Sequence, residues 1–164
     1  MAIAGIVQPV LIQIDDSLRL RKFDGSYAFA LRWYQDPALV YLVDGKKEPY
    51  TMEKLTRMYT FLANAGELYF IEILENGGYR PIGDVTFWQN DLPIVIGEPA
   101  YRGRGIGRRV VAALVERGRQ LGYSQLYVQE IYAYNTGSQK CFESVGFRPY
   151  EQTEKGARYV LDLT

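Results

Sequence analysis

The sequence has no histidine and only one cysteine, Cys141, among its 164 residues. The absence of histidine excludes histidine-dependent catalytic triads, cysteine–histidine nucleophiles and the commonest ligand of transition metals. A lone cysteine excludes both an intramolecular disulfide and a four-cysteine zinc site. An enzyme built from this chain must therefore use carboxylates, tyrosines, backbone amides and a cofactor, and we expect no bound metal.

The chain also lacks a net charge and a long apolar run. Its 19 basic and 19 acidic residues balance to zero, so a general binder of nucleic acid or of an anionic membrane is not favoured. No stretch approaches the roughly 20 apolar residues of a membrane span. The first 16 residues carry no basic region and are interrupted by Pro9, so they do not resemble a secretory signal. We expect a protein of the reducing cytoplasm.

The composition that remains is that of a globular protein, with 48% apolar and 23% charged residues. A chain of this length corresponds to one domain, so we predict a single domain over residues 1–164. Helical periodicity, strand alternation and turn residues predict an α/β chain that combines an antiparallel hairpin half with βαβ-type crossovers. The expected strands are 10–14, 18–23, 68–74, 82–88, 94–96, 125–132, 147–150 and 159–163, and the expected helices are 27–34, 52–65, 105–121 and 135–145. Ser26 and Thr51 are candidate N-caps of the first two helices, and Asn76-Gly77 predicts a hairpin turn. Asn135 could cap the last helix or reach an amide of a bound ligand.

The most informative stretch runs from Tyr101 to Arg109, between an expected strand and an expected helix. Its three glycines allow a close approach of the backbone to a ligand and positive φ angles. The N–H groups that begin a helix lack intrahelical partners and carry the positive end of the helix dipole. Residues 102–119 hold six arginines and one glutamate, so the rest of the chain is net acidic. These features predict a cradle for the pyrophosphate of a small ligand.

Two other phosphate motifs fit this loop poorly. A Walker loop needs Lys and Ser or Thr after its last glycine, whereas Gly107 is followed by two arginines. A dinucleotide fingerprint needs a glycine where the chain has Arg108.

A second motif begins at Asn135, and the two together resemble the GNAT superfamily of acetyl-CoA-dependent N-acetyltransferases. The first segment is similar to the family pattern R/Q-x-x-G-x-G/A, and the second to the pattern N-x-x-[A/S]-x-x-x-[Y/F]-x-x-x-G-F. The matching residues are Arg102, Gly105 and Gly107, and then Asn135, Ser138, Phe142, Gly146 and Phe147. The resemblance implies a GNAT-type fold, with a central mixed, mostly antiparallel twisted sheet flanked by helices. It also implies a cofactor-binding core at about 82–150 and acceptor-side elements at about 24–66.

The resemblance further implies how acetyl-CoA, the cosubstrate, is held. The strand ending at Ile96 and Gly97 would lie along the pantetheine, and a backbone N–H of one of these two residues would polarise the thioester carbonyl. Asn135 would contact the pantetheine arm, and Ser138 and Phe142 would flank the thioester. The pyrophosphate would be held by main-chain N–H groups of Arg102, Gly103, Arg104, Gly105, Ile106, Gly107 and Arg108.

The expected reaction is direct attack of a neutral amine on the thioester in a ternary complex, which requires a base to deprotonate the ammonium. The base candidates are Asp91, Glu98 and Glu130, of which Glu130 would lie among apolar strand residues. Many relatives have a tyrosine that protonates the leaving thiolate, whereas this chain has Phe142. Tyr132 and Tyr134 are the candidate substitutes, or the thiolate leaves unprotonated. We interpret Cys141 as a small buried apolar residue.

The acceptor is expected to be a primary amine, and a small one such as an aminoglycoside or polyamine is favoured over a protein or peptide amine. The aromatic and acidic side chains of the acceptor side suit a cation. The candidates are Trp33, Tyr34, Asp84 and Trp88, although core packing is the commoner fate of the two tryptophans. Two other functions stay open, a non-catalytic acyl-CoA-binding domain and a nucleic-acid module built on the arginines. The resemblance is also compatible with a homodimer.

Overall fold

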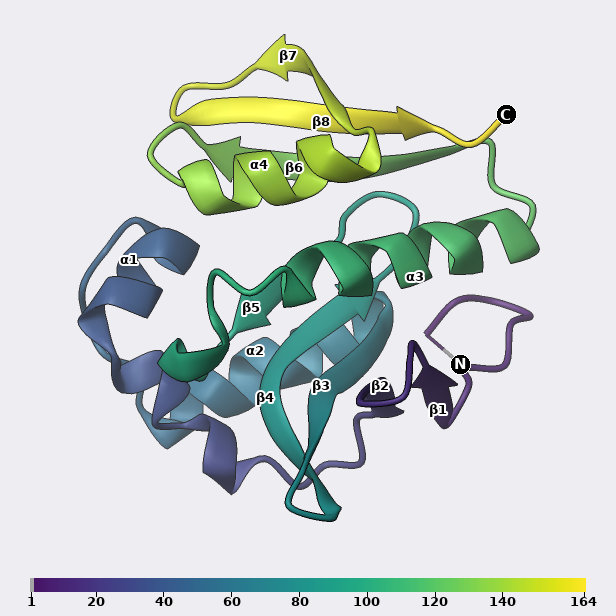
Figure 1. Ribbon diagram of the computed structural model, residues 1–164. Helices are drawn as coiled ribbons and strands as arrows, with labels where there is room; N and C mark the ends of the chain where they lie inside the picture. Colours follow the sequence, from purple (N-terminus) through teal and green to yellow (C-terminus); the bar gives the residue numbers. More distant parts are fainter. Residues whose placement is uncertain (1) are drawn as a thin grey trace. The chain divides into compact units, whose positions relative to one another are not determined.

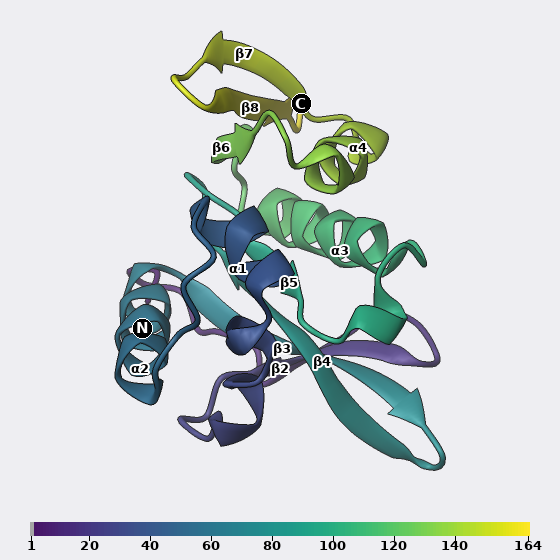
Figure 2. The same ribbon diagram turned by 90° about the vertical axis from the view of Figure 1, so that its left-hand side faces the viewer.

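The computed structural model describes residues 2–164, which form two compact units. The first unit comprises residues up to Thr86 together with Ile94–Tyr101, and the second comprises Phe87–Pro93 and Arg102–Thr164. Figure 1 shows the elements of both units, and Figure 2 shows them from the side. The expected α/β class with mostly antiparallel sheets is confirmed.

The first unit is built on a five-stranded sheet with the order β1-β2-β3-β4-β5. Two-residue alternation buries Leu18 and Leu20 of β2, which pair with Ile73 and Ile71 of β3 in an antiparallel register. β4 pairs with β5 in an antiparallel register that sets Asp84 opposite Val95. The strands are β1 (Leu11–Gln13), β2 (Leu18–Lys22), β3 (Glu67–Glu75), β4 (Gly78–Phe87) and β5 (Ile94–Ile96).

A tight turn joins β3 to β4. Asn76 and Gly77 both adopt positive φ angles, 53° and 79°. This conformation produces the twist that a two-residue hairpin needs, and Asn-Gly is the sequence that tolerates it best. The hairpin predicted from these two residues is therefore confirmed.

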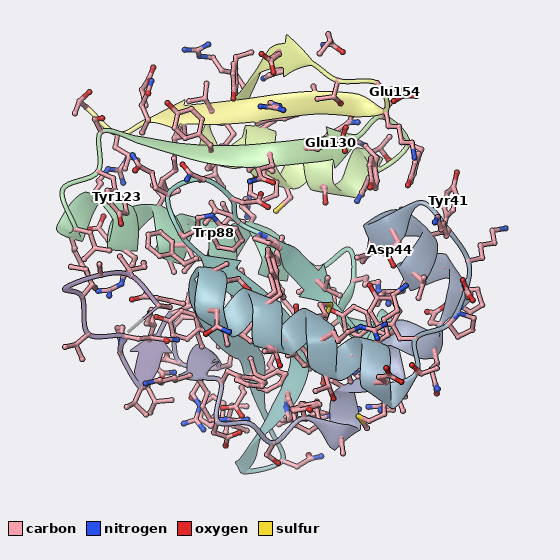
Figure 3. The ribbon with its side chains drawn as sticks, turned by 180° about the vertical axis from the view of Figure 1, so that it is seen from behind. Tyr41, Asp44, Trp88, Tyr123, Glu130 and Glu154 are labelled. Carbon is pink, nitrogen blue, oxygen red and sulfur yellow. The ribbon has the colours of Figure 1, made fainter. Side chains whose placement is uncertain are left out.

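Helix α2 (Met52–Ala65) covers one face of this sheet (Figures 1 and 3). The Thr51 hydroxyl accepts a hydrogen bond from the Lys54 N–H at 3.2 Å, which caps the start of the helix. Leu55, Tyr59 and Leu62 follow at helical spacing and are buried. The predicted cap and helix are both confirmed.

The predicted helix over 27–34 is wrong. Two short 3-10 turns, Ala28–Ala30 and Trp33–Gln35, take its place. Ser26 caps neither turn, because the residues at their cap positions are Tyr27 and Arg32 and no side chain caps either turn. The chain then forms a helix that the sequence analysis missed, α1 (Pro37–Asp44), in which Asp36 caps the start by accepting from the Ala38 N–H at 3.0 Å. Asp-Pro begins this helix because proline is well suited to a first helical position.

The second unit contains a three-stranded antiparallel sheet with the order β6-β8-β7. Helices α3 and α4 pack against each other. The elements are α3 (Ile106–Gln120), β6 (Gln125–Tyr132), α4 (Thr136–Val145), β7 (Arg148–Gln152) and β8 (Gly156–Asp162). Each lies within a few residues of its predicted position.

Candidate functional site

The glycine-rich loop of the second unit leads into α3. Gly103 and Gly105 adopt left-handed φ angles of 70° and 77°, and α3 begins directly after Gly105 with no side-chain cap. A Cβ added at Gly103 would meet no atom within 4 Å, and one at Gly105 would meet only the Arg108 guanidinium at 4.0 Å. The turn is therefore open around its two glycines, and no side chain caps the first N–H groups of α3, which are features that an anion site at a helix start needs.

The loop departs from expectation at one glycine. Gly107 lies inside the first turn of α3 and has no positive φ. Two of the three glycines are thus needed for their backbone conformation. Gly107 is not required for its backbone conformation, so the property of glycine that matters there is its lack of a side chain.

Helix α4 begins at Asn135, whose side chain accepts a hydrogen bond from the Ser138 N–H at 3.1 Å. This is the capping alternative for Asn135, and it leaves the amide NH2 as a donor. Phe142 is buried, and its ring packs edge-on against Phe147 with centroids 5.2 Å apart. Burial also raises the pKa of the neighbouring Cys141 thiol to about 11, which agrees with its interpretation as an apolar residue.

At the end of β5, the two backbone N–H groups proposed to contact the thioester, those of Ile96 and Gly97, point in different directions. The Gly97 N–H donates to the carbonyl of Ile82 at 2.7 Å, so it is already engaged. Because N–H groups alternate in direction along a strand, the Ile96 N–H points away from β4. Of the two N–H groups, that of Gly97 is therefore directed at β4 and that of Ile96 is not.

Glu98, one of the three base candidates, is a buried structural carboxylate. It pairs with the guanidinium groups of Arg32 and Arg80, the latter at 3.0 Å. It also accepts a hydrogen bond from Trp33 Nε1 at 2.6 Å. Two cations and an indole N–H thus surround the Glu98 carboxylate.

The other two base candidates lie in the second unit. The Asp91 carboxylate accepts from the backbone N–H groups of Leu92 at 3.0 Å and Gln129 at 3.1 Å, so it organises a turn, and burial raises its pKa. Glu130 is exposed on β6 and accepts from the Thr153 hydroxyl (Figure 3). The expectation that Glu130 lies among apolar residues is wrong, because its side chain is on the solvent face of the strand.

The candidate tyrosine donor, Tyr134, is 37% exposed and stacks on Tyr132 with centroids 5.3 Å apart. Trp88 is half-buried at the turn after β4. Trp33 is 2% exposed, so its dominant environment is the core.

The structure brings Tyr34 and Asp84 together. The Tyr34 hydroxyl donates to Asp84 Oδ2 at 2.7 Å, and Tyr59 of α2 donates to the same oxygen at 2.8 Å. All three side chains are buried. Burial raises the pKa of Asp84 to about 6, and the two hydroxyls act in the opposite direction.

Sequence reasoning missed Tyr59, which belongs to this group, and Thr86, which lies two residues after Asp84 on the same face of β4. Tyr59 counted as one of the apolar residues of its helix, and its hydroxyl was not considered. A signal was present in β4, where strand alternation places Ile82, Asp84 and Thr86 on one face of a segment that is otherwise apolar. Polar residues on the buried face of a strand need partners, which makes them candidates for a site.

No group of three or more Cys, Asp or Glu side chains within residues 2–164 could hold a metal ion. None of the helices described is long and apolar enough to cross a membrane.

The family model described as "Acetyltransferase (GNAT) domain" matches residues 17–148. An uncharacterised protein of Methanocaldococcus jannaschii is 27% identical over 161 residues, which cover 94% of this chain and 32% of that protein. The chain thus spans about a third of the length of this curated relative.

Solved structures share the fold. A domain from M. jannaschii is 25% identical, with a TM-score of 0.77 over 90% of this chain and 99% of that one. An aminoglycoside acetyltransferase solved with coenzyme A is 18% identical, with a TM-score of 0.72 over 89% and 95%. An acetyltransferase from Agrobacterium tumefaciens is 16% identical, with a TM-score of 0.73 over 95% and 96%.

Proposed function

The chain belongs to the GNAT acetyltransferase domain family, and from this premise we propose that it transfers an acetyl group from acetyl-CoA to a small primary amine. One observation carries the proposal. The R-x-x-G-x-G segment forms an open, left-handed turn at the uncapped start of a 15-residue helix. The family match and the local geometry therefore support the same ligand chemistry.

The residues of the loop fit a pyrophosphate. Backbone N–H groups of the first turn of α3 would hold its oxygens, and the positive end of the helix dipole would stabilise their charge. Arg102, Arg104 and Arg108 supply cations in the same segment. Bound acetyl-CoA would supply the thioester whose carbonyl carbon is attacked.

Two backbone and side-chain groups are proposed to contact the rest of the cosubstrate. The Asn135 side-chain NH2 would donate to an amide of the pantetheine arm while its oxygen continues to cap α4. The Ile96 N–H would donate to the thioester oxygen and stabilise the negative charge that develops there. Tyr134 is the proposed proton donor to the leaving thiolate, because Phe142 has no exchangeable proton.

A small cationic acceptor is favoured by the first unit's own side chains. The face of β4 that carries Asp84 lies against the side chains of Tyr34 and Tyr59, whose hydroxyls both donate to it. Aromatic rings and a carboxylate attract an alkylammonium ion. A similar structure, 17% identical, was solved with coenzyme A and kanamycin; at that identity it supports the fold, and the class of acceptor rests on this chain's residues.

The test is a panel of amines with acetyl-CoA, in which release of the free thiol is followed in single-turnover and steady-state experiments. We expect thiol release that depends on polyamines or aminoglycosides and exceeds that with an N-terminal peptide or a lysine peptide. Preferential acetylation of a peptide would show that the acceptor is a protein or peptide amine and not a small amine. Tight binding of acetyl-CoA with no amine-dependent release would instead support the acyl-CoA-binding alternative, which the loss of the family tyrosine at Phe142 favours.

A further inference from the structure

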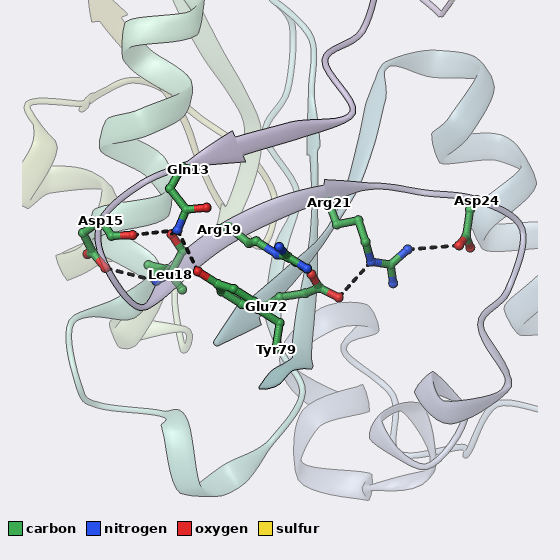
Figure 4. Close-up of polar contacts among 8 residues, drawn as sticks. All are labelled: Gln13, Asp15, Leu18, Arg19, Arg21, Asp24, Glu72 and Tyr79. Atoms are coloured by element: carbon green, nitrogen blue, oxygen red, sulfur yellow. Dashed lines mark hydrogen bonds and ion pairs between the residues drawn. The ribbon is translucent and has the colours of Figure 1, made fainter. Parts of the chain in front are cut away.

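Asp84 differs from two other buried carboxylates of the first unit, Glu72 and Glu98, in having no cation. Glu72 lies between Arg19 and Arg21, each at 2.8 Å (Figure 4), and Glu98 lies between Arg32 and Arg80. Asp84 is 3% exposed, and within residues 2–164 its hydrogen-bond donors are two tyrosines. Burying an ionised carboxylate without a cation costs desolvation free energy and so lowers stability. The presence of Asp84 at this position therefore suggests a role other than stabilising the fold.

The two oxygens of Asp84 are used unequally. Both tyrosine hydroxyls donate to Oδ2, whereas Oδ1 accepts no hydrogen bond from the residues described. Thr86 lies on the same face of β4, is fully buried, and its Oγ1 has no partner. Buried polar atoms in folded proteins nearly always have hydrogen-bond partners. Asp84 Oδ1 and Thr86 Oγ1 could therefore accept hydrogen bonds from a donor that the protein does not supply.

We propose that this donor is the acceptor's ammonium group and that Asp84 removes its proton, while Tyr34 and Tyr59 are positioning residues that hold the carboxylate. The proposal rests on the proposed function and replaces Asp91, Glu98 and Glu130 as base. The N–H bond of the ammonium breaks and an O–H bond forms on Asp84 Oδ1, which leaves a neutral amine. The amine nitrogen then bonds to the thioester carbon and the C–S bond breaks. The leaving thiolate takes the Tyr134 hydroxyl proton, and the second amine proton goes to the Tyr134 oxygen or to solvent.

The surroundings of Asp84 suit this role. Burial raises its pKa to about 6, so at neutral pH the group is an ionised base of useful strength. Its titratable neighbours are Tyr34, Tyr59 and Tyr50, and β5 contributes the uncharged Val95 opposite it. On β3 the buried titratable pair, Glu67 and Tyr69, is joined at 2.9 Å and does not contribute to the pKa of Asp84.

The experiment compares pH profiles of kcat/KM for the intact chain with a polyamine and acetyl-CoA. Wild type should lose activity below about pH 6. Asp84→Asn should lower kcat at pH 7 by about a hundredfold or more, leave KM for acetyl-CoA within about threefold, and regain rate at high pH, where the free amine is abundant. Tyr59→Phe removes a hydrogen bond that lowers the pKa of Asp84, so the acid limb should move upward by about one pH unit.

The chain contains a matched control. The Tyr50 hydroxyl donates to Asp44 at 2.9 Å, so Tyr50→Phe and Asp44→Asn make the same chemical changes at a carboxylate that Lys54 accompanies. Neither should move the acid limb. If Asp84→Asn does not fold, the comparison of Tyr59→Phe with Tyr50→Phe still decides the question.

The possible results separate the two proposals. A wild type that acetylates no amine in the panel overturns the proposed function, and the role of Asp84 with it. An active wild type whose Asp84→Asn variant keeps its rate and acid limb overturns the role of Asp84 alone. An acid limb that Tyr59→Phe leaves in place, or that Tyr50→Phe moves equally, also overturns it.

Discussion

Gly97 has no room for a side chain. A Cβ built there would lie 2.3 Å from Cγ and Cδ2 of the Trp33 indole. The indole cannot move easily, because its Nε1 donates to Glu98, and the Gly97 backbone is held by its bond to Ile82. We expect Gly97→Ala to lower the free energy of unfolding by about 1–3 kcal/mol, measured by urea denaturation.

Gly78 is the control for this substitution. It also lies in a strand of the same sheet, has no positive φ, and has nothing within 4 Å of an added Cβ. Gly78→Ala should therefore leave the free energy of unfolding within about 0.5 kcal/mol of wild type. Equal effects of the two substitutions would contradict this prediction, because they would show that the Trp33 indole can move to accommodate a Cβ at Gly97.

Glu98 offers a second test at the scale of a residue. Glu98→Gln removes the charge that two arginines and an indole N–H surround, so we expect a loss of about 1–3 kcal/mol of unfolding free energy. The acid limb of the pH–rate profile should stay near pH 6, because the charge on Glu98 is structural. A limb that disappears in Glu98→Gln, together with unchanged stability, would return Glu98 to the role of base.

At the scale of elements, local signals predicted the structure where one strong local preference acts alone. Thr51 and the apolar spacing after it predicted α2, and Asn76–Gly77 predicted the hairpin. The prediction of a helix over 27–34 failed because tertiary packing, and not local preference, determines the backbone conformation of this segment. Its aromatic side chains, such as Trp33, are buried against the sheet, and the backbone forms short 3-10 turns to place them.

The same distinction applies to the candidate site. The loop that leads to α3 could be predicted, since glycines and arginines at the start of a helix have a local physical meaning. The partners of Asp84, Asp91 and Glu98 could not, because each carboxylate is paired by residues distant in sequence, such as Tyr34 at a separation of 50 residues from Asp84. Sequence alone therefore could not separate a structural carboxylate from a reactive one.

The start of α3 carries a prediction of its own. Gly107 has no positive φ, so a larger residue there meets no backbone strain. Gly107→Val places a branched side chain in the first turn, beside the N–H groups proposed to hold the pyrophosphate. We expect the Kd for acetyl-CoA, measured by calorimetry, to rise at least tenfold, with only a small loss of stability.

Ala112→Val is the matched control, because it makes a branched residue at an exposed position in the middle of the same helix. It should have a similar small effect on stability and leave the Kd for acetyl-CoA unchanged. We would abandon the loop as the pyrophosphate site if Gly107→Val bound acetyl-CoA as tightly as Ala112→Val. Gly105→Val is a poorer probe, because at a φ of 77° it would strain the backbone as well as fill the site.

At the scale of the whole molecule, the formal net charge is zero. The buried carboxylates nevertheless differ in whether a cation accompanies them. Glu72 and Glu98 each form ion pairs with two arginines. Asp84 is not matched in this way, and ionising it works against folding. The stability of the whole protein should therefore depend on pH in part through the Asp84 carboxyl group.

The direction of that dependence follows from the pKa of Asp84, which rises from 3.8 to about 6 on folding. Between these values the native state binds more protons than the unfolded state, so the contribution of Asp84 to stability is complete below about pH 4 and is lost as the pH rises through 6. Asp84→Asn lacks this titration, and the difference in unfolding free energy between wild type and variant isolates it. We expect wild type to lose roughly 2 kcal/mol relative to the variant between about pH 4.5 and 7.5, as measured by urea denaturation in a series of buffers. A difference that stays constant over this range would mean that Asp84 has an ordinary pKa, and a carboxylate with an ordinary pKa would be a weaker base than the proposed proton transfer requires.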